Sequence, residues 1–177
     1  MVSIMGMLAV CVLVCAVMVQ IKAAAVQDAD VKKSEATNDL VKRSRPCGYG
    51  WTQIHDRCFR YIPVLQTWSR AERDCRSKGA TLASVHDIQE YHEIQRLILT
   101  ATHSYQETWI GGSDAQEEGF WLWSDGSAFL YTNWCPGEPN NHLGRNQDCL
   151  KMNFLSAKCW DDVQCSFRYP YVCAKKM

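Results

Sequence analysis

The sequence predicts an α+β domain in which two helices precede a sheet and a long irregular region. Apolar residues recur at helical spacing in two segments, 67–79 and 88–99, and no long helical pattern follows Tyr105. Beyond that residue, short aromatic and β-branched runs alternate with Gly, Asn, Asp and Pro. This alternation is typical of strands that are joined by turns and loops.

The first 25 residues have the composition of a secretory signal. Residues 1–19 are apolar apart from Ser3, and Ala23, Ala24 and Ala25 supply the small residues that precede a cleavage site. A membrane anchor is the alternative, because the apolar run approaches the length of a span and no Lys or Arg precedes it. The cysteine content of the remaining chain favours export. We therefore expect a signal peptide over 1–25, no stable membrane insertion, and a secreted, extracellular protein.

Residues 26–46 are expected to be a propeptide or a linker. From residue 26 to 45 there is no aromatic residue, Gly, Pro or Cys, and such a segment cannot bury a core. Its basic end, Lys42-Arg43-Ser44-Arg45, suits a processing site and a solvated linker equally well. All seven tryptophans and eight of the ten cysteines follow it, so the folded domain is expected over 47–177.

The folded segment begins with a predicted hairpin in "GWTQIHDRCFRYI", whose second strand is aromatic. The first helix is expected after Thr67, with Trp68, Ala71, Cys75 and the stem of Arg76 facing inward and Gly79 ending it. The second helix, 88–99, has Asp87 as N-cap and Glu90 three residues later, which predicts a capping box. Its expected inner stripe consists of Ile88, Tyr91, Ile94, Gln95 and Ile98. Strands are then expected in "TWIGG", "GFWLWSDG", "CLKMNF", "KCWDD" and "YPYVCAKK".

Charge and cysteine usage exclude several classes of function. The segment 47–177 carries thirteen basic and fifteen acidic residues without a block of one sign, which disfavours a nucleic-acid partner. Its eight cysteines predict four disulfides in a secreted domain, and none of them forms the close C-x₂-C pair that a zinc site would use. No partnered nucleophile, paired-acid motif or phosphate loop is present, so we do not expect an enzyme.

The order of these motifs resembles the long form of the C-type lectin-like domain from Cys47 to Cys173. The resemblance is carried by the hairpin, the two helices, "WIGGSD", "FWLWSDG", the Glu-Pro-Asn tripeptide of "CPGEPNNH", "DCLKMNF", "CWDDVQC" and "YVCAKK". It implies two helices and antiparallel sheets with a long loop region. It also implies the disulfides Cys47–Cys58, Cys75–Cys173 and Cys149–Cys165, while a Cys135–Cys159 pair is similar to the extra bridge of fish lectins and fish type II antifreeze proteins.

The resemblance further implies a Ca²⁺ site formed by Glu138, Asn140, Gln147, Asp161 and Asp162, with a cis bond before Pro139. Gln147 stands where the family usually has Glu, and Asp161 where it usually has Asn. The two exchanges leave three carboxylates and two amides, which suit a calcium ion. A second set, Asp114, Glu118, Asn141 and Asp148, resembles the ligands of another ion, but its spacing and missing acids lead us to expect no ion there.

In the resembling lectins, two sugar hydroxyls coordinate the ion and hydrogen-bond to its ligands. Here Glu138 with Asn140 would serve one hydroxyl and Gln147 with Asp161 the other. His142 directly follows the loop motif and could touch a bound sugar, although an exposed loop histidine without a role fits the sequence equally well. Glu-Pro-Asn goes with mannose-type sugars in the family. We therefore expect a calcium-dependent lectin for mannose-type glycans on microbial surfaces, acting in innate recognition.

Two other functions on the same fold stay open. The first is ice binding as in type II antifreeze proteins, although Thr132 is the only threonine after Ile110 and ice-binding surfaces are expected to bear threonines. The second is calcium-independent protein binding. Trp109, Trp121 and Trp123 lie in strand motifs and are expected in the core. The oligomeric state stays open, because the sequence shows no heptad stalk.

Overall fold

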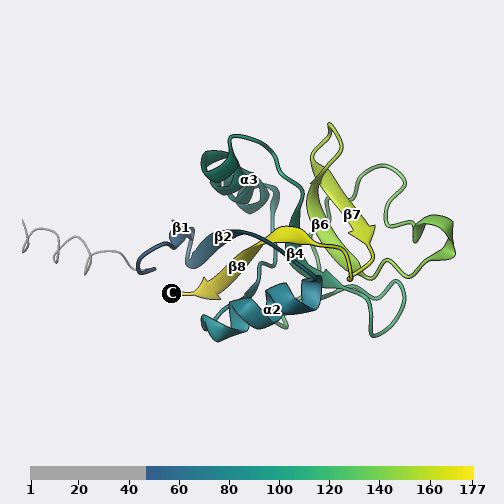
Figure 1. Cartoon of the computed structure of the whole chain (residues 1–177), viewed down its shortest axis with the longest axis horizontal. Coiled ribbons are helices and arrows are strands. Elements are labelled where there is room, and N and C mark those ends of the chain that lie inside the picture. Colours follow the sequence, from purple (N-terminus) through teal and green to yellow (C-terminus); the bar gives the residue numbers. More distant parts are fainter. Residues whose placement is uncertain (1–46) are drawn as a thin grey trace, which may run out of the picture. The chain divides into compact units, whose positions relative to one another are not determined.

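An eight-stranded sheet with two helices makes up the part of the chain that the computed structural model describes, residues 47–177 (Figure 1). The expected signal peptide and the propeptide or linker lie outside these residues, so both stay predictions. Within 47–177, no helix is long and apolar enough to cross a bilayer.

The order of elements confirms the predicted α+β class. The sheet order is β1-β2-β8-β4-β6-β7, and β3 and β5 pair with β8 and β4. Neighbouring strands are antiparallel, except that β4 and β8 meet in parallel at Trp109 and Tyr171. This parallel contact joins segments far apart in the sequence and was not predicted. The elements are β1 Thr52–Ile54, β2 Arg57–Gln66, α2 Trp68–Ser77, β3 Thr81–Leu82, α3 Ile88–Thr102, β4 Thr108–Ser113, β5 Leu122–Trp123, the 3₁₀ turn η1 His142–Gly144, β6 Cys149–Phe154, β7 Cys159–Val163 and β8 Tyr169–Lys176.

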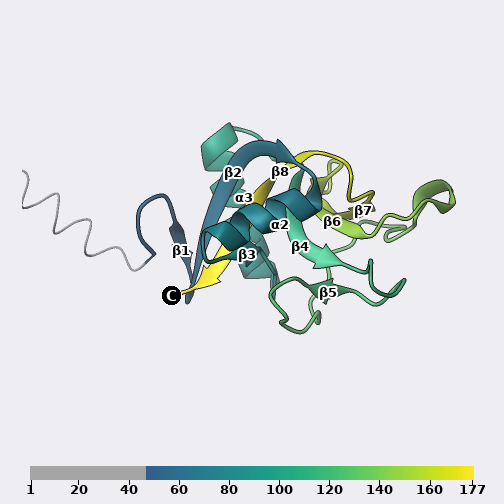
Figure 2. The ribbon, with the colours of Figure 1, turned by 60° about the horizontal axis from the view of Figure 1, so that its bottom comes forward.

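The helices cover opposite faces of the sheet, with β2 and β8 between them (Figures 1 and 2). Successive residues of β8 therefore enter different cores. Tyr171 and Cys173 pack in the cluster that includes α2, whereas Val172 and Ala174 pack in the cluster that includes α3. Because successive side chains of a strand point to opposite faces, a strand covered on both sides is buried at every position.

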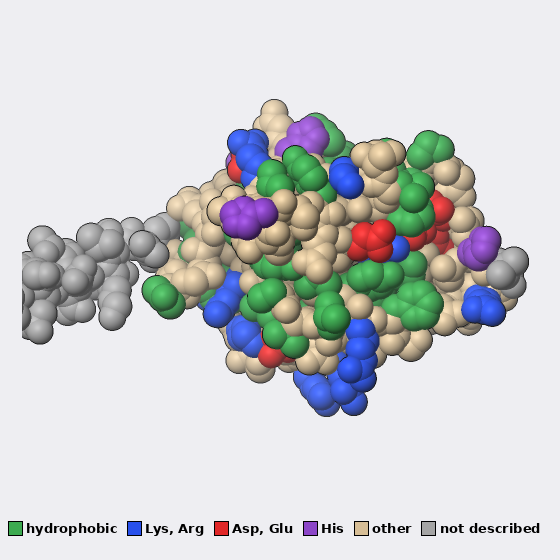
Figure 3. Space-filling view, turned by 45° about the horizontal axis from the view of Figure 1, so that its top comes forward, with side chains coloured by type: hydrophobic (Ala, Val, Ile, Leu, Met, Phe, Trp, Pro, Cys, Tyr) green, Lys and Arg blue, Asp and Glu red, His purple; other side chains and the backbone are tan. Residues whose placement is uncertain are grey.

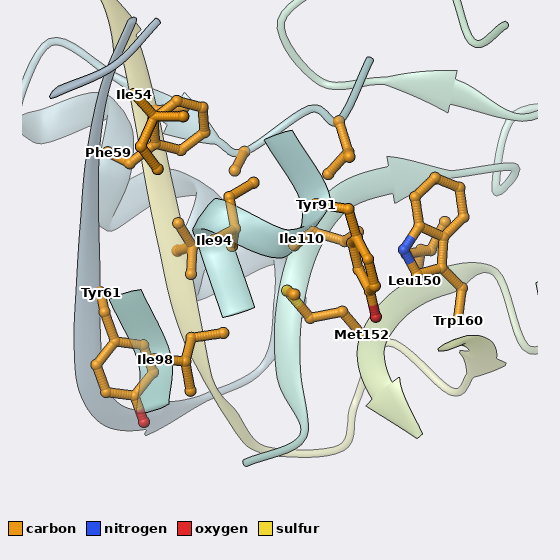
Figure 4. Close-up of a cluster of buried hydrophobic side chains, with 14 of the residues drawn as sticks. Ile54, Phe59, Tyr61, Tyr91, Ile94, Ile98, Ile110, Leu150, Met152 and Trp160 are labelled. Carbon is orange, nitrogen blue, oxygen red and sulfur yellow. The ribbon is translucent and has the colours of Figure 1, made fainter. Parts of the chain in front are cut away.

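The second helix begins at the predicted N-cap, but the predicted capping box is incomplete, because the Glu90 side chain accepts from the backbone amide of His86 at 2.8 Å and pairs with Arg57 rather than returning to the amide of Asp87. Asp87 is the N-cap, and its side chain accepts a hydrogen bond of 2.7 Å from the backbone amide of Glu90. Figure 4 shows the α3 side chains of Tyr91, Ile94 and Ile98 directed into the core between β2 and the inner strands. The expected burial of Ile88 is wrong: the residue is 45% exposed at the start of the helix, whereas Glu90 in the same turn is buried.

The first helix also occupies the predicted segment, with Thr67 at the N-cap position and Gly79 in the left-handed conformation just after the helix. Ala71 and Cys75 are fully buried. The expected burial of the Arg76 stem is wrong. Its side chain is 58% exposed, and its guanidinium lies across the surface, paired with Glu72 at 2.6 Å and donating to the carbonyl of Ser124 at 2.7 Å.

An aromatic cluster around Trp160 joins the long loop region to β7. The ring of Trp160 is fully buried, and four rings from the loop segment 123–134 lie within 6.0 Å of it, centroid to centroid. Trp109 and Trp123 are buried and Trp121 packs against the core, so the predicted core placement of these three is confirmed. The irregular region is therefore fixed by aromatic packing rather than by regular hydrogen bonding.

Disulfides connect the sheet to both helical and loop segments. The structure contains Cys75–Cys173, Cys135–Cys159 and Cys149–Cys165, which confirms three predicted pairs. Cys47 and Cys58 are disulfide-bonded as well. The Cys75–Cys173 bridge attaches α2 to the central strand β8, across 98 residues of sequence.

The N-cap of α3 gives a test of local stability. Replacement of Asp87 with Ala removes the acceptor for the Glu90 amide, and we expect the free energy of unfolding to fall by about 0.5–2 kcal/mol. Asp87→Asn keeps a side-chain oxygen at the cap and is expected to unfold close to the wild type. Urea denaturation with the disulfides intact measures both. Equal midpoints for Asp87→Ala and the wild type would contradict the assignment.

Candidate metal and ligand site

The loop that carries Glu138 is fastened to the outer edge of β7. Cys135 is disulfide-bonded to Cys159, and its amide donates to the carbonyl of Trp160 at 2.9 Å. The Trp160 amide donates in turn to the carbonyl of Asn133 at 2.8 Å. Since β7 is the last strand of the sheet, this loop covers its free hydrogen-bonding edge.

Three carboxylates meet where this loop crosses β7. Ligand oxygens of Glu138, Asp161 and Asp162 all lie within 4.8 Å of one another. The Glu138–Pro139 bond is cis, in agreement with the resemblance. Asp161 and Asp162 are both buried, and the Oε2 atom of Glu138 is buried without a hydrogen-bond partner in the structure.

The side chain of Asp162 holds the loop in place by accepting hydrogen bonds from two backbone amides of the loop. One carboxylate oxygen accepts from the amide of Asn140 and the other from the amide of Asn141, each at 2.9 Å. Two hydrogen bonds to one carboxylate fix its plane, because both oxygens have a defined partner. Asp162 is therefore oriented before any ligand arrives.

Crowding of the three acids raises the pKa of Glu138. Burial is the largest cause, followed by the negative charge of Asp161 and by Asp162, and together they raise the pKa to about 7. Burial also raises the pKa of Asp161, although Lys151 at 3.2 Å opposes this shift. Burial and neighbouring negative charge thus disfavour the ionised forms of Glu138 and Asp161, and a cation beside them would favour those forms.

The donor set fits a hard divalent cation. Carboxylate oxygens, with amide oxygens close by, suit Ca²⁺ better than metals that prefer sulfur or imidazole ligands. The unpaired, buried Oε2 atom of Glu138 is the observation that tests this fit, because such an atom requires a partner. A cation among the three acids would supply one.

The two predicted amide ligands and His142 belong to the loop segment that follows Glu138. The side chain of Asn140 is exposed, as is that of His142. Gln147 is half-buried, and its Oε1 atom accepts a hydrogen bond from the amide of His142. The backbone amide of Gln147 donates to the side-chain Oδ1 atom of Asn141 at 2.7 Å. Hydrogen bonds within the loop therefore hold this part of it in place.

The second predicted acid set is likewise tied into loop hydrogen bonds. Asp114 is buried, and its Oδ2 atom accepts from the backbone amide of Gly119 at 2.9 Å, whereas its Oδ1 atom has no hydrogen-bond partner among the described residues. Glu118 accepts from the side chain of Asn141 at 2.6 Å. We propose no ion at this set.

Lys151 is the residue near the site that the sequence analysis missed. Its side chain is only 5% exposed, and its Nζ atom lies 2.8 Å from Oε2 of Glu107 and 3.2 Å from Oδ2 of Asp161. The signal was available, because a lysine in the middle of the apolar strand "CLKMNF" requires buried partners.

The comparisons with known proteins agree with the fold. A model of the Lectin C-type domain matches residues 64–175. Ladderlectin of Oncorhynchus mykiss is 43% identical over 70% of this chain, and the match spans 65% of that protein. The galactose-specific lectin nattectin of Thalassophryne nattereri is 39% identical over 74% of this chain and 81% of its own.

The sheet and loops also superpose on an antifreeze protein. The crystal structure of a calcium-independent type II antifreeze protein is 37% identical, with a TM-score of 0.66 over 73% of this chain and 94% of its own. A protein of this fold therefore does not need calcium in every case. The metal and the ligand of this chain have to be argued from its own residues.

The raised pKa of Glu138 predicts a pH dependence of stability. Between about pH 4.5 and 7, the folded state retains a proton on Glu138 that the unfolded state has lost, so in EDTA the free energy of unfolding falls as the pH rises through this range. Glu138→Gln removes this contribution and is expected to flatten the decline. Urea titrations at pH 5, 6 and 7 measure it. Glu117→Gln, at an exposed acid, serves as control, and an unchanged slope in Glu138→Gln would refute the expectation.

Proposed function

The chain belongs to the Lectin C-type domain family, and on this premise we propose that it is a secreted, calcium-dependent lectin for mannose-type glycans. The observation that supports the proposal best is the meeting of Glu138, Asp161 and Asp162 at the Glu-Pro-Asn loop, with one Glu138 oxygen buried and unpaired. Ca²⁺ would supply a positive centre to which neighbouring sugar hydroxyls bind.

Each predicted ligand has a defined part in this proposal. Glu138, Asp161 and Asp162 would hold the ion with carboxylate oxygens, and Asn140 and Gln147 would add amide oxygens. Asp162 would in addition keep the loop closed through the amides of Asn140 and Asn141, as it does in the structure. Gln147 would have to turn its side-chain oxygen from the His142 amide toward the ion.

Sugar recognition would use the same side chains from the solvent side. The exposed amide of Asn140 can donate to a hydroxyl that donates to Glu138, and Gln147 with Asp161 can serve the neighbouring hydroxyl. His142 is exposed beside this rim and can contact the sugar ring. The mannose-type preference rests on the Glu-Pro-Asn resemblance, whereas nattectin, a relative, is described as galactose-specific.

The biological partners proposed here are mannose-type glycans on microbial surfaces, in extracellular innate recognition. One shallow site binds a sugar weakly, so useful avidity would require several sites in one assembly. Figure 3 shows acidic, basic and apolar side chains on one face of the molecule, with several basic side chains together at its lower edge.

Ice binding is the second candidate, because a type II antifreeze protein shares the fold at 37% identity. That protein is described as calcium-independent, so ice binding on this fold does not require calcium in every case. The scarcity of threonine after Ile110 in this chain favours the lectin. Thermal hysteresis measured on the purified protein decides between the two.

Chromatography on immobilised sugars tests the lectin proposal. We expect retention on a mannose resin in Ca²⁺, elution by EDTA, and little retention on galactose. The variant Glu138→Gln/Asn140→Asp is expected to move retention toward galactose, because it creates the Gln-Pro-Asp motif that goes with galactose in the family. Retention insensitive to EDTA would refute the calcium dependence, and retention on neither resin would refute the lectin proposal.

Gln147 gives a test of the exchanged ligand pair. If Asp161 compensates for the missing acid at 147, Gln147→Glu adds a fourth carboxylate and is expected to tighten calcium binding in calorimetry. Gln116→Glu, at an exposed position, adds the same charge outside the acid cluster and serves as the control. Equal affinities in Gln147→Glu and the wild type would count against Gln147 as a ligand.

A further inference from the structure

A buried lysine stands directly behind the acid group. Lys151 lies in the middle of β6, where it pairs with Trp109 of β4 on one side and with Asp161 of β7 on the other. Its neighbours Leu150 and Met152 point into the core that includes α3, so Lys151 points to the opposite face. A cross-strand neighbour is within reach of its partner, and here the two side chains form an ion pair.

The ammonium group is confined from every side. Besides Asp161 and Glu107, its Nζ atom lies 4.5 Å above the ring of Phe154 and 5.1 Å from that of Tyr169. Confinement by two carboxylates and two rings leaves the charge with little freedom to turn toward water. A buried cation of this kind acts strongly on any charge beside it, because water screens it poorly.

The two carboxylates that share Lys151 differ in their access to water. Glu107 has a side chain that is 36% exposed, whereas that of Asp161 is 9% exposed. Water can solvate Glu107 in the absence of the lysine, but it reaches Asp161 poorly. The negative charge of Asp161 therefore depends on Lys151 more than that of Glu107 does, because an uncompensated buried charge is costly.

We propose that Lys151 is a positioning residue of the candidate site, which holds the Asp161 carboxylate and lowers the negative charge that the three acids present to a divalent cation. In this arrangement Oδ2 of Asp161 is directed to Lys151, and Oδ1 is left for the site. An acid compensated in this way is electrostatically close to the amide that the family usually has at this position. The inference rests on the proposed calcium site and explains how an aspartate is accommodated there.

Two variants separate this role from a purely structural one. Lys151→Met removes the charge but keeps an unbranched side chain against Phe154 and Tyr169, and is expected to bind Ca²⁺ about ten-fold more tightly, the effect of one charge several Å away in a partly hydrated site. Glu107→Gln leaves Lys151 to Asp161 alone and is expected to weaken Ca²⁺ binding several-fold. Both variants are expected to melt at lower temperature in EDTA, because each loses an ion pair.

Calorimetric titration with CaCl₂ and melting in EDTA measure these effects, with Lys78→Met, which breaks the Lys78–Asp74 pair on α2, as control. Affinities that move in opposite directions while both melting temperatures fall support the inference. Unchanged or weaker binding in Lys151→Met, with the wild type binding Ca²⁺, overturns it and leaves the calcium proposal intact. Binding only in Lys151→Met overturns the calcium proposal for the wild type and supports the lysine's role, whereas no binding in either protein overturns both.

Discussion

The pairing of the Glu138 loop with the free edge of β7 is the interaction on which the candidate site depends. The carbonyl and amide of Trp160 bind the backbone on either side of Trp134, and the Cys135–Cys159 bridge closes the same junction. The buried ring of Trp160 then gathers the aromatic side chains of the loop region. An irregular loop is thereby held as firmly as a strand, which is what a set of converging ligands requires.

This junction brings together charges that would otherwise repel one another. Glu138 enters from the loop and Asp161 and Asp162 from the strand, and the two aspartates are buried whereas Glu138 is half-buried. The structure relieves part of the repulsion internally, because Asp162 accepts two loop amides and Asp161 accepts Lys151. Glu138 has no such partner for its Oε2 atom and is the acid whose pKa rises to about 7. The same three acids can thus accept a cation or, without one, remain folded together with Glu138 protonated at neutral pH or below.

Family membership establishes the fold of this chain, but it does not establish which ligand the chain binds. The similar proteins include ladderlectin, a galactose-specific lectin and a calcium-independent antifreeze protein, so one scaffold carries several binding functions. What differs between such functions is the set of side chains on the loops rather than the sheet beneath them. For this chain the proposed function rests on the Glu-Pro-Asn loop and on the carboxylates of Asp161 and Asp162 beside it.

The sequence by itself determined the class, the two helices, the strands and the composition of the predicted ligand set, because these depend on local periodicity, capping residues and recognisable motifs. Asp87 and Gly79 mark helix ends through interactions within a few residues. The tertiary structure alone decided that β4 lies parallel to β8, that Glu138 and not its neighbours is left unpaired, and that Lys151 compensates Asp161. Those outcomes depend on burial and on contacts between residues distant in the chain, and a carboxylate or an ammonium group acquires its character only from the partners that folding places beside it.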